Sequence, residues 1–210
     1  NTWADLNVTF YPRTLHRGLV SFLSQSGGIG LALKGKADDE GLGFSKWIGV
    51  GNRVNLEFYT LLDYLAEDPH TNVIGIFAEG CDDPRMLVDA IRRVTKSKPV
   101  VFYKGGRGKD ANRVTISHTG AIAGIDAIWN GALTQSGAEI VSSAAEMISV
   151  CKALSIGSRP KGKKIGIFTH TAGPSIVAWD VLQQIPNCVL PELKQESLTR
   201  IADVLGPSVP

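Results

Sequence analysis

A histidine surrounded by small residues is the feature of this chain that most directly indicates chemistry. Residues 117–124 read SHTGAIAG, and they follow a basic, glycine-rich run over 104–109. Neutral imidazole is a good nucleophile at neutral pH, because its ordinary pKa lies at about 6.5. The small neighbours of His118 leave room for a large group on the ring, and a phosphoryl group is one candidate. The other interpretation is a loop histidine that makes a structural hydrogen bond.

A glycine-rich turn after an apolar run offers a second site, one suited to an anion. Apolar residues 19–23 lead into Ser26, Gly27 and Gly28, and a helix-like run follows over 31–40. A strand, a glycine-rich turn and a helix in this order aim free N–H groups and the positive end of the helix dipole at an anion. We expect Ser26 to be the N-cap and all three residues to bind phosphate. Tight turns need glycine regardless of ligand, so this motif alone is weak evidence.

The same unit recurs later in the sequence. The run 164–168 (KIGIF) precedes the turn at 169–174, which contains Ala172 and Gly173, and a helix-like run follows over 175–184. Two such units predict two α/β modules, each with an anion site. Two helix N-termini facing one phosphohistidine would explain the pair, so Ala172 and Gly173 are also predicted to bind phosphate.

Apolar strand patterns alternate with helical patterns before the second unit. The expected strands are 19–23, 46–50, 73–77, 100–103 and 139–141, and the expected helices are 29–40, 56–67, 83–95, 124–136 and 144–154. Short apolar strands between helices favour a parallel sheet that is covered on both faces. Such sheets place ligands at the carboxyl ends of the strands. Ser26, Gly51, Glu79 and the run 104–108 all follow strand ends, so we expect them to share one edge.

Composition excludes several classes of protein. With 210 residues, of which 43% are hydrophobic, the chain can build packed cores. A net charge of +2 gives no reason to expect nucleic acid or an anionic membrane as a partner. No apolar stretch approaches the roughly 20 residues of a membrane span. Cys81, Cys151 and Cys188 lack metal-like spacing, so we predict no metal site and a reducing, cytoplasmic location.

In four segments the chain resembles the NDP-forming acyl-CoA synthetases, which are relatives of succinyl-CoA synthetase. The segments are 19–30 with its Ser-Gln-Ser-Gly turn, 48–52 with the helix 57–67, 77–80 (FAEG), and 117–124. The resemblance covers almost the whole chain, and the histidine loop is its most specific part. It implies a phosphohistidine on His118, contacts to the phosphoryl group from Thr119 and Gly120, and a pairing of Glu79 with the histidine.

Glu79 ends an apolar strand, where a carboxylate is costly unless it is paired. Its implied role is to accept a proton from one ring nitrogen of His118. That contact fixes the tautomer, leaves the other nitrogen free to attack phosphorus, and stabilises the cationic ring formed on phosphorylation. The structural alternative is a helix cap, because Asp82 and Asp83 follow and precede a helix.

The resemblance also implies the domain organisation. We expect a flavodoxin-like, doubly wound parallel sheet over residues 1–157, which is the phosphohistidine domain. The linker-like run 157–163 then leads into the incomplete beginning of a second flavodoxin-like α/β domain over residues 158–210. His170 stands in the second glycine-rich turn, where the family pattern favours a smaller polar residue, so its role stays open.

The expected partners lie largely outside this chain. The resemblance implies acyl-CoA, CoA and phosphate as reactants, together with Mg²⁺-bound ATP/ADP or GTP/GDP. A CoA-binding domain and an ATP-grasp domain are both expected elsewhere, in the same chain or in a partner subunit of an oligomer. The chain is therefore expected to be a fragment of an acid–thiol ligase, one that lacks full activity alone. The acyl group and the choice between ADP and GDP stay open.

Two other classes of function fit part of the pattern. The first is an inactive synthetase-like module, regulatory or linked to an acyltransferase, that binds acyl-CoA without turnover. The presence of both His118 and Glu79 argues against it. The second is a flavodoxin-like binding module for a phosphorylated ligand, which explains the glycine-rich turns but not the histidine loop.

Overall fold

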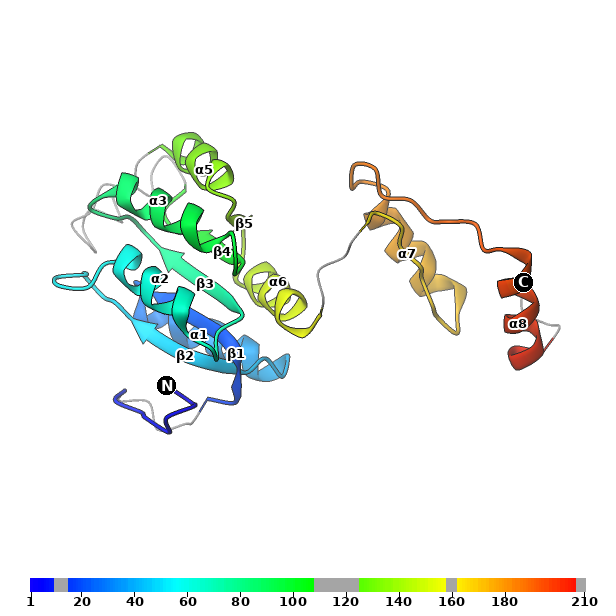
Figure 1. The fold of residues 1–210 in the computed structure, drawn as a ribbon, viewed down its shortest axis with the longest axis horizontal. Coiled ribbons are helices and arrows are strands. Elements are labelled where there is room, and N and C mark those ends of the chain that lie inside the picture. Colours follow the sequence, from blue (N-terminus) through cyan, green and yellow to red (C-terminus); the bar gives the residue numbers. More distant parts are fainter. Residues whose placement is uncertain (10–14, 108–124, 158–161, 207–210) are drawn as a thin grey trace. The chain divides into compact units, whose positions relative to one another are not determined.

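The computed structural model describes residues 1–9, 15–107, 125–157 and 162–206. Contacts divide the chain into two compact units, residues 1–158 and residues 159–210. The first unit carries a sheet with helices around it, and the second carries two helices (Figure 1).

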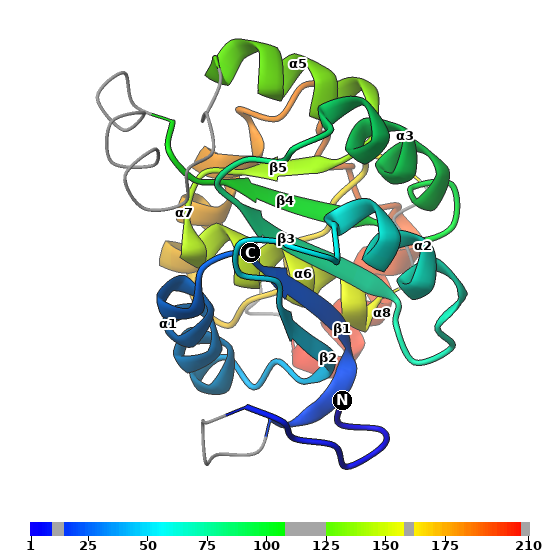
Figure 2. The same cartoon turned by 90° about the vertical axis from the view of Figure 1, so that its left-hand side faces the viewer.

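The first unit is built on a five-stranded sheet of order β2-β1-β3-β4-β5, in which every pairing is parallel (Figure 2). The strands are β1 (Arg17–Ser24), β2 (Phe44–Gly49), β3 (Val73–Ala78), β4 (Val100–Lys104) and β5 (Glu139–Val141). This strand order is that of flavodoxin. The predicted flavodoxin-like parallel sheet is therefore confirmed.

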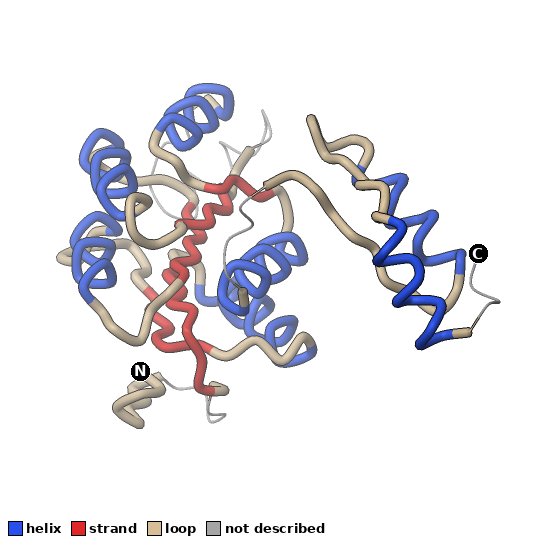
Figure 3. The backbone as a smooth tube through the Cα atoms, turned by 45° about the vertical axis from the view of Figure 1, so that its right-hand side comes forward, coloured by secondary structure: helices blue, strands red, loops and turns tan. Residues whose placement is uncertain are grey.

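Helices cover both faces of this sheet, which Figure 3 shows between two helical layers. They are α1 (Gly27–Asp39), α2 (Phe58–Glu67), α3 (Pro84–Val94), α5 (Asp126–Gln135) and α6 (Ala144–Ile156). Helices α1 and α6 pack on one face, and α2, α3 and α5 pack on the other. A parallel sheet buried on both faces explains why its strands read as continuous apolar runs.

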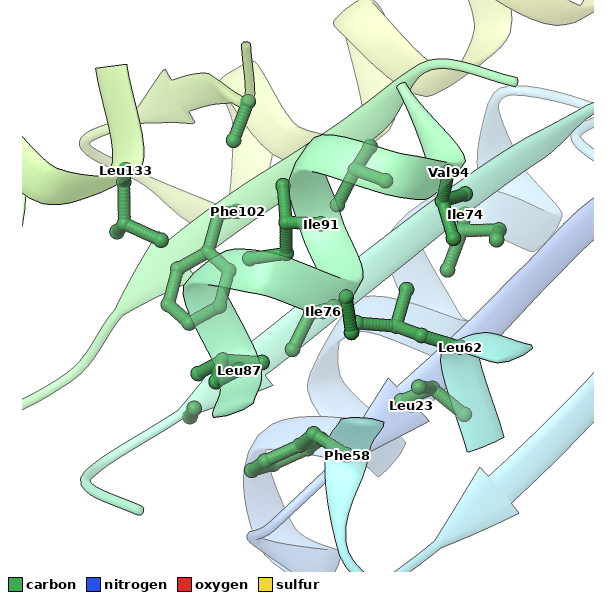
Figure 4. Packing of buried hydrophobic residues seen from close by; sticks show 14 of the residues in the cluster. Leu23, Phe58, Leu62, Ile74, Ile76, Leu87, Ile91, Val94, Phe102 and Leu133 are labelled. Carbon is green, nitrogen blue, oxygen red and sulfur yellow. The ribbon is translucent and has the colours of Figure 1, made fainter. Parts of the chain in front are cut away.

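Two apolar clusters hold these layers together, one on each face. Strand residues alternate between the faces because side chains on a strand have a period of two. Figure 4 shows one cluster, in which residues of α2, α3 and α5 pack on residues of β1, β3 and β4 (Phe58, Leu62, Leu87, Ile91, Val94 and Leu133 on Leu23, Ile74, Ile76 and Phe102). On the opposite face, Phe22 and Phe44 pack with Leu33 of α1 and Met147 of α6.

A buried polar network lies near the start of β3. The Lys46 ammonium and the Thr71 hydroxyl both donate to the Asp68 carboxylate, and the Lys46 and Asp68 side chains are only 6% and 7% exposed. The hydroxyls of Ser21 and Ser45 also bond to Thr71, at 2.8 and 2.9 Å. Burial by itself raises the pKa of Asp68, but the hydrogen bonds from Lys46 and Thr71 outweigh it and hold the pKa below its ordinary value.

Removing the Asp68 carboxylate should be strongly destabilising. We expect Asp68→Ala to lower the free energy of unfolding by about 3–5 kcal/mol, because Lys46 would stay buried without its partner. The control is Asp63→Ala, which breaks a pair with Arg93 at 2.8 Å whose side chains are about half exposed; it should cost less than about 1 kcal/mol. Urea titration measures both. Equal losses in the two variants would show that the buried pair contributes nothing special.

The contribution of Asp68 should also depend on pH. A carboxyl whose pKa is lowered by folding stabilises the folded state above its unfolded pKa and loses that contribution as the pH falls. The stability difference between wild type and Asp68→Ala should therefore be full above about pH 5 and should shrink as the pH drops below about 4. Unfolding curves across this range test it, and a difference that stays constant down to low pH would contradict it.

The second unit departs from the sequence-based expectation. It contains α7 (Ala172–Leu182) and α8 (Gln195–Leu205), but residues 164–168, predicted as a strand, form no strand in the described structure. Lys164 makes an isolated parallel bridge to Val189, and the Ile165 N–H donates to the Val189 carbonyl at 3.0 Å. A strand needs a neighbour along its length, and here the pairing ends after one bridge; Phe168 is 93% exposed.

Candidate functional site

The turn between β1 and α1 has the geometry predicted for anion binding. Ser26 is the N-cap of α1, and its hydroxyl accepts from the Ile29 N–H at 3.3 Å, so the predicted cap is confirmed. Gly27 and Gly28 occupy the first turn of the helix, where N–H groups have no intrahelical acceptor. Within the described structure, a Cβ added at either glycine would meet no atom within 4 Å. The turn is therefore open to a ligand.

A cavity of about 550 Å³ adjoins this turn along α1. Its lining includes Ser26 and Gly27 at the helix N-terminus, together with apolar surface from Leu31 and Trp47. A volume of this size is in the range of small-molecule sites. The open helix N-terminus thus borders a space large enough for more than a phosphate group.

Glu79 lies directly after β3, in a turn that is fixed through its main chain. The N–H groups of Glu79 and Gly80 donate to the Gln25 side-chain oxygen, at 2.9 and 3.3 Å. The Lys104 ammonium donates to the Glu79 carbonyl at 2.7 Å. The turn is thereby held to the ends of both neighbouring strands, β1 and β4. Ser26, which follows Gln25, and Glu79 consequently share the carboxyl edge of the sheet, as expected.

The helix-cap interpretation of Glu79 does not hold. The N-cap of α3 is Asp83, whose carboxylate accepts from the Met86 N–H at 3.0 Å. Glu79 is half-buried at the strand end, and its side chain packs closely on the chain opposite. A Cβ added at Gly105 would lie 3.2 Å from Glu79 Cγ and 2.9 Å from Phe77 Cζ. Glycine at position 105 therefore leaves the space that the Glu79 side chain occupies.

Lys104 is buried, although a basic run such as 104–109 is usually solvated. It is 2% exposed, and its ammonium lies 5.3 Å from the centre of the Trp129 ring. Burial lowers the pKa of Lys104, and the nearby negative charges of Asp126 and Glu79 oppose that effect. Its ammonium donates to the carbonyls of Glu79 and Gly105, so Lys104 ties two strand-end turns together.

Arg53 is a residue of this edge that sequence reasoning missed. It lies in the loop after β2 with a left-handed φ of 56°, and its side chain is 3% exposed. The guanidinium pairs with Glu57 at 3.1 Å and Asp82 at 2.9 Å, and it donates to the Gly80 carbonyl at 3.0 Å. It therefore connects the loop after β2 to the turn that carries Glu79. The sequence shows only an Asn-Arg pair after a glycine, and this pattern does not indicate that the arginine is buried.

Neutralising Arg53 should loosen this connection. We expect Arg53→Met to lower the free energy of unfolding by about 3 kcal/mol, because Glu57, 12% exposed, would lose its counter-charge. The matched control is Arg92→Met, which breaks an exposed pair with Asp89 at 2.7 Å; its cost should stay below about 1 kcal/mol. Chemical denaturation gives both values. If Arg53→Met lowered the free energy of unfolding no more than the control does, the Arg53 contacts would not contribute to stability.

Arg107 also binds protein groups rather than solvent alone. Its guanidinium pairs with Asp126 at 3.2 Å and donates to the Asn130 side-chain oxygen at 3.3 Å. The Asn130 amide in turn donates to Asp126 at 2.9 Å. Asp126 and Asn130 thus fix the end of the basic run onto α5.

Cys81 does not compete with histidine as a nucleophile. Burial, followed by the charge of Glu57, raises the pKa of the Cys81 thiol to about 12. Because the thiolate is the reactive form, a thiol with this pKa stays unreactive at neutral pH.

The remaining predicted residues lie in other parts of the chain. His118, Thr119 and Gly120 fall outside the described residues. Ala172 and Gly173 begin α7 in the second unit, and the exposed His170 precedes the Thr171 N-cap. Within the described ranges, no group of three or more His, Cys, Asp or Glu side chains could hold a metal ion. No helix in those ranges is long and apolar enough to cross a membrane.

Comparison with known families gives a match to this sheet. Residues 17–154 match the family model described as "Succinyl-CoA ligase like flavodoxin domain". The matched range begins at β1 and ends within α6, so it covers the whole sheet and both helical layers.

Curated relatives resemble the chain over nearly all of its length. The alpha subunit of acetate–CoA ligase [ADP-forming] II of Pyrococcus furiosus is 35% identical over 99% of this chain and 45% of its own. A 4-hydroxybutyrate–CoA ligase [ADP-forming] of Nitrosopumilus maritimus is 30% identical over 98% of this chain and 29% of its own. The chain thus spans less than half the length of these relatives.

A solved structure is also similar to this chain. It is the dinucleotide-forming acetyl-coenzyme A synthetase 1 of Candidatus Korarchaeum cryptofilum, in complex with phosphate and ADP. The similarity has a TM-score of 0.88 at 34% identity and covers 98% of this chain and 44% of that chain.

Proposed function

Because this chain belongs to the succinyl-CoA ligase-like flavodoxin domain family, we propose that it is part of an NDP-forming acyl-CoA synthetase. One observation carries this proposal. The 2.9 Å bond from the Glu79 N–H to Gln25 joins the turn of the predicted base to the turn that starts α1. The open N-terminus of α1 and Glu79 therefore lie at the same sheet edge, which supports the proposal. The two relatives above are named as ADP-forming ligases, which supports the same conclusion.

The proposed reaction transfers a phosphoryl group through His118. Phosphate attacks the thioester carbon, the C–S bond breaks, and CoA leaves an acyl phosphate behind. A ring nitrogen of His118 then attacks phosphorus, and the bond to the acyl oxygen breaks to release the carboxylate. Finally, the terminal oxygen of a nucleoside diphosphate attacks phosphorus, the P–N bond breaks, and the triphosphate forms. Each step runs in reverse when acyl-CoA is synthesised.

The residues of this chain have distinct roles in the proposal. Glu79 accepts a hydrogen bond from the N–H of the second ring nitrogen, and its negative charge stabilises the cationic phosphohistidine. The N–H groups at Gly27 and Gly28 bind phosphoryl oxygens, since positioning and electrostatic stabilisation dominate phosphoryl transfer. Further contacts to the phosphoryl group are proposed for Thr119 and Gly120. The same role is proposed for Ala172 and Gly173 at the second helix N-terminus.

Other domains complete the proposed enzyme. CoA and the nucleotide bind to a CoA-binding domain and an ATP-grasp domain, in the same chain or in a partner subunit of an oligomer. Mg²⁺ accompanies ATP/ADP or GTP/GDP at the nucleotide domain and neutralises phosphate charge there. The enzyme is proposed to act in the cytoplasm.

The test is the product pattern of the full-length protein with its partner subunit. Acyl-CoA formation is measured with a panel of carboxylic acids, CoA, Mg²⁺ and either ATP or GTP. The expected products are acyl-CoA, a nucleoside diphosphate and phosphate. Nucleoside monophosphate with pyrophosphate would contradict the proposal. Tight acyl-CoA binding without turnover would instead favour the inactive acyl-CoA-binding module.

A further inference from the structure

Gln25 has a buried amide nitrogen that has no hydrogen-bond partner among the described residues. The residue is 6% exposed, and among the described residues its Nε2 is the one buried side-chain nitrogen or oxygen that lacks a hydrogen-bond partner. Buried polar groups in folded proteins are nearly always hydrogen-bonded, so such an exception needs an explanation. One explanation is that a ligand supplies the missing acceptor.

The orientation of this amide is fixed by its surroundings. Two main-chain donors, the N–H groups of Glu79 and Gly80, point at the same side-chain atom, at 2.9 and 3.3 Å. That atom must be an acceptor, and it is therefore the oxygen Oε1. Rotating the amide by 180° would set the NH₂ group against two donors. The other side-chain atom of the Gln25 amide is consequently the nitrogen Nε2, which can only donate hydrogen bonds.

Cations at this edge are already engaged by the protein. Lys104 donates to two carbonyls, Arg53 binds Glu57, Asp82 and a carbonyl, and Arg107 binds Asp126 and Asn130. Arg17 and Lys34, which line the adjoining cavity, are likewise paired with Asp5 and Asp38. Among the described residues, an anion at the β1–α1 turn can therefore use neutral N–H donors. The first-turn N–H groups of Gly27 and Gly28 provide two, and they lie two and three residues beyond Gln25.

We propose that Gln25 is a binding residue for the phosphate substrate, with Nε2 donating to a phosphate oxygen beside the α1 N-terminus. This inference rests on the proposed function, because it takes phosphate as the reactant at this edge. The same amide then serves two purposes. Its oxygen holds the Glu79 turn, and its nitrogen binds the anion, so phosphate is placed at a fixed distance from the proposed base.

The variant Gln25→Glu separates the two purposes. A carboxylate keeps an acceptor for the N–H groups of Glu79 and Gly80, but it replaces the donor with a second, negatively charged acceptor. We expect the Kd for inorganic phosphate, measured by calorimetry on the full-length protein without other substrates, to rise roughly 10- to 100-fold, because hydrogen bonds to charged groups are strong. In turnover, the KM for phosphate should rise similarly, while the KM for nucleotide stays within about twofold.

Gln135→Glu is the matched control. Gln135 is exposed at the carboxyl end of α5, and helices in this fold run opposite to the strands, so it lies at the other edge of the sheet. The substitution is chemically identical and should leave the phosphate Kd unchanged. Gln25→Met is a second variant, to be used if Gln25→Glu fails to fold, because methionine introduces no charge. Its phosphate Kd should rise about tenfold.

An unchanged phosphate Kd in a folded Gln25 variant would overturn the inference and leave the residue a purely structural tie. The failure of the proposed function gives a different result. If the wild type binds phosphate and Gln25→Glu does not, yet no acyl-CoA is made, the Gln25 assignment stands and the synthetase proposal falls.

Discussion

Replacing His118 with alanine in the full-length protein is expected to abolish both phosphorylation and acyl-CoA synthesis. In the proposed route every phosphoryl group passes through this ring, and burial raises the pKa of the Cys81 thiol to about 12, so that thiol stays unreactive at neutral pH. Loss of a covalent nucleophile typically lowers kcat by several orders of magnitude, on the order of 10³ or more. Incubation with Mg²⁺ and γ-labelled nucleoside triphosphate measures the first effect, and acyl-CoA formation measures the second.

The stability of the label identifies the residue type. A phosphate on nitrogen is lost in acid and retained in base, whereas a phosphoserine behaves in the opposite way. His70→Ala is the control, because His70 stacks on Trp3 at 4.1 Å and precedes β3, at the amino edge of the sheet. It should retain label and activity. Near-normal synthesis by His118→Ala would show that the phosphohistidine assignment is wrong.

The second large effect is expected for Glu79→Gln. The main-chain N–H and carbonyl of residue 79 hold this turn, and the substitution changes neither of them, so the variant should fold normally. Glutamine keeps the size of the side chain but not the negative charge that stabilises the imidazolium form. Losing one well-placed electrostatic partner costs on the order of 10²–10³ in rate. Rapid-quench measurement of phosphohistidine formation tests this directly.

The control for this charge change is Glu139→Gln on the exposed side of β5, which should phosphorylate at the wild-type rate. A Glu79→Gln rate within about threefold of wild type would remove Glu79 from the mechanism, since general-base or electrostatic partners contribute at least about 10².

Much of the fold followed from local patterns in the sequence. Apolar runs bounded by glycine or charge predicted all five strands, with β5 at its observed limits of Glu139 and Val141. Ser26 was identifiable as a cap because it precedes two glycines and a helical pattern. The shared edge of Ser26 and Glu79 followed from a general property of parallel sheets, whose strand ends meet on one side.

What sequence reasoning missed depends on contacts between distant segments. Gln25 and Arg53 look like ordinary polar loop residues, and only the folded chain brings Gly80 against both of them. Lys104 belongs to a basic run, yet its side chain is buried, because its ammonium donates to the carbonyls of two turns at strand ends. Residues 164–168 have a strand-like pattern, but whether such a segment forms a strand depends on the neighbouring segment that it pairs with as well as on its own sequence.

The strand order bears on how the sheet forms during synthesis. In the order β2-β1-β3-β4-β5, every strand after β1 pairs with a strand that precedes it in the chain. The sheet can therefore grow as the polypeptide leaves the ribosome, since no strand must wait for a later one in order to find a first partner. The largest loop is closed when Val73 of β3 pairs with Val20 of β1, so this step carries the greatest entropic cost among the strand pairings. We therefore expect docking of β3 onto β1 to limit the folding rate, with β4 and β5 adding afterwards to an edge that already exists.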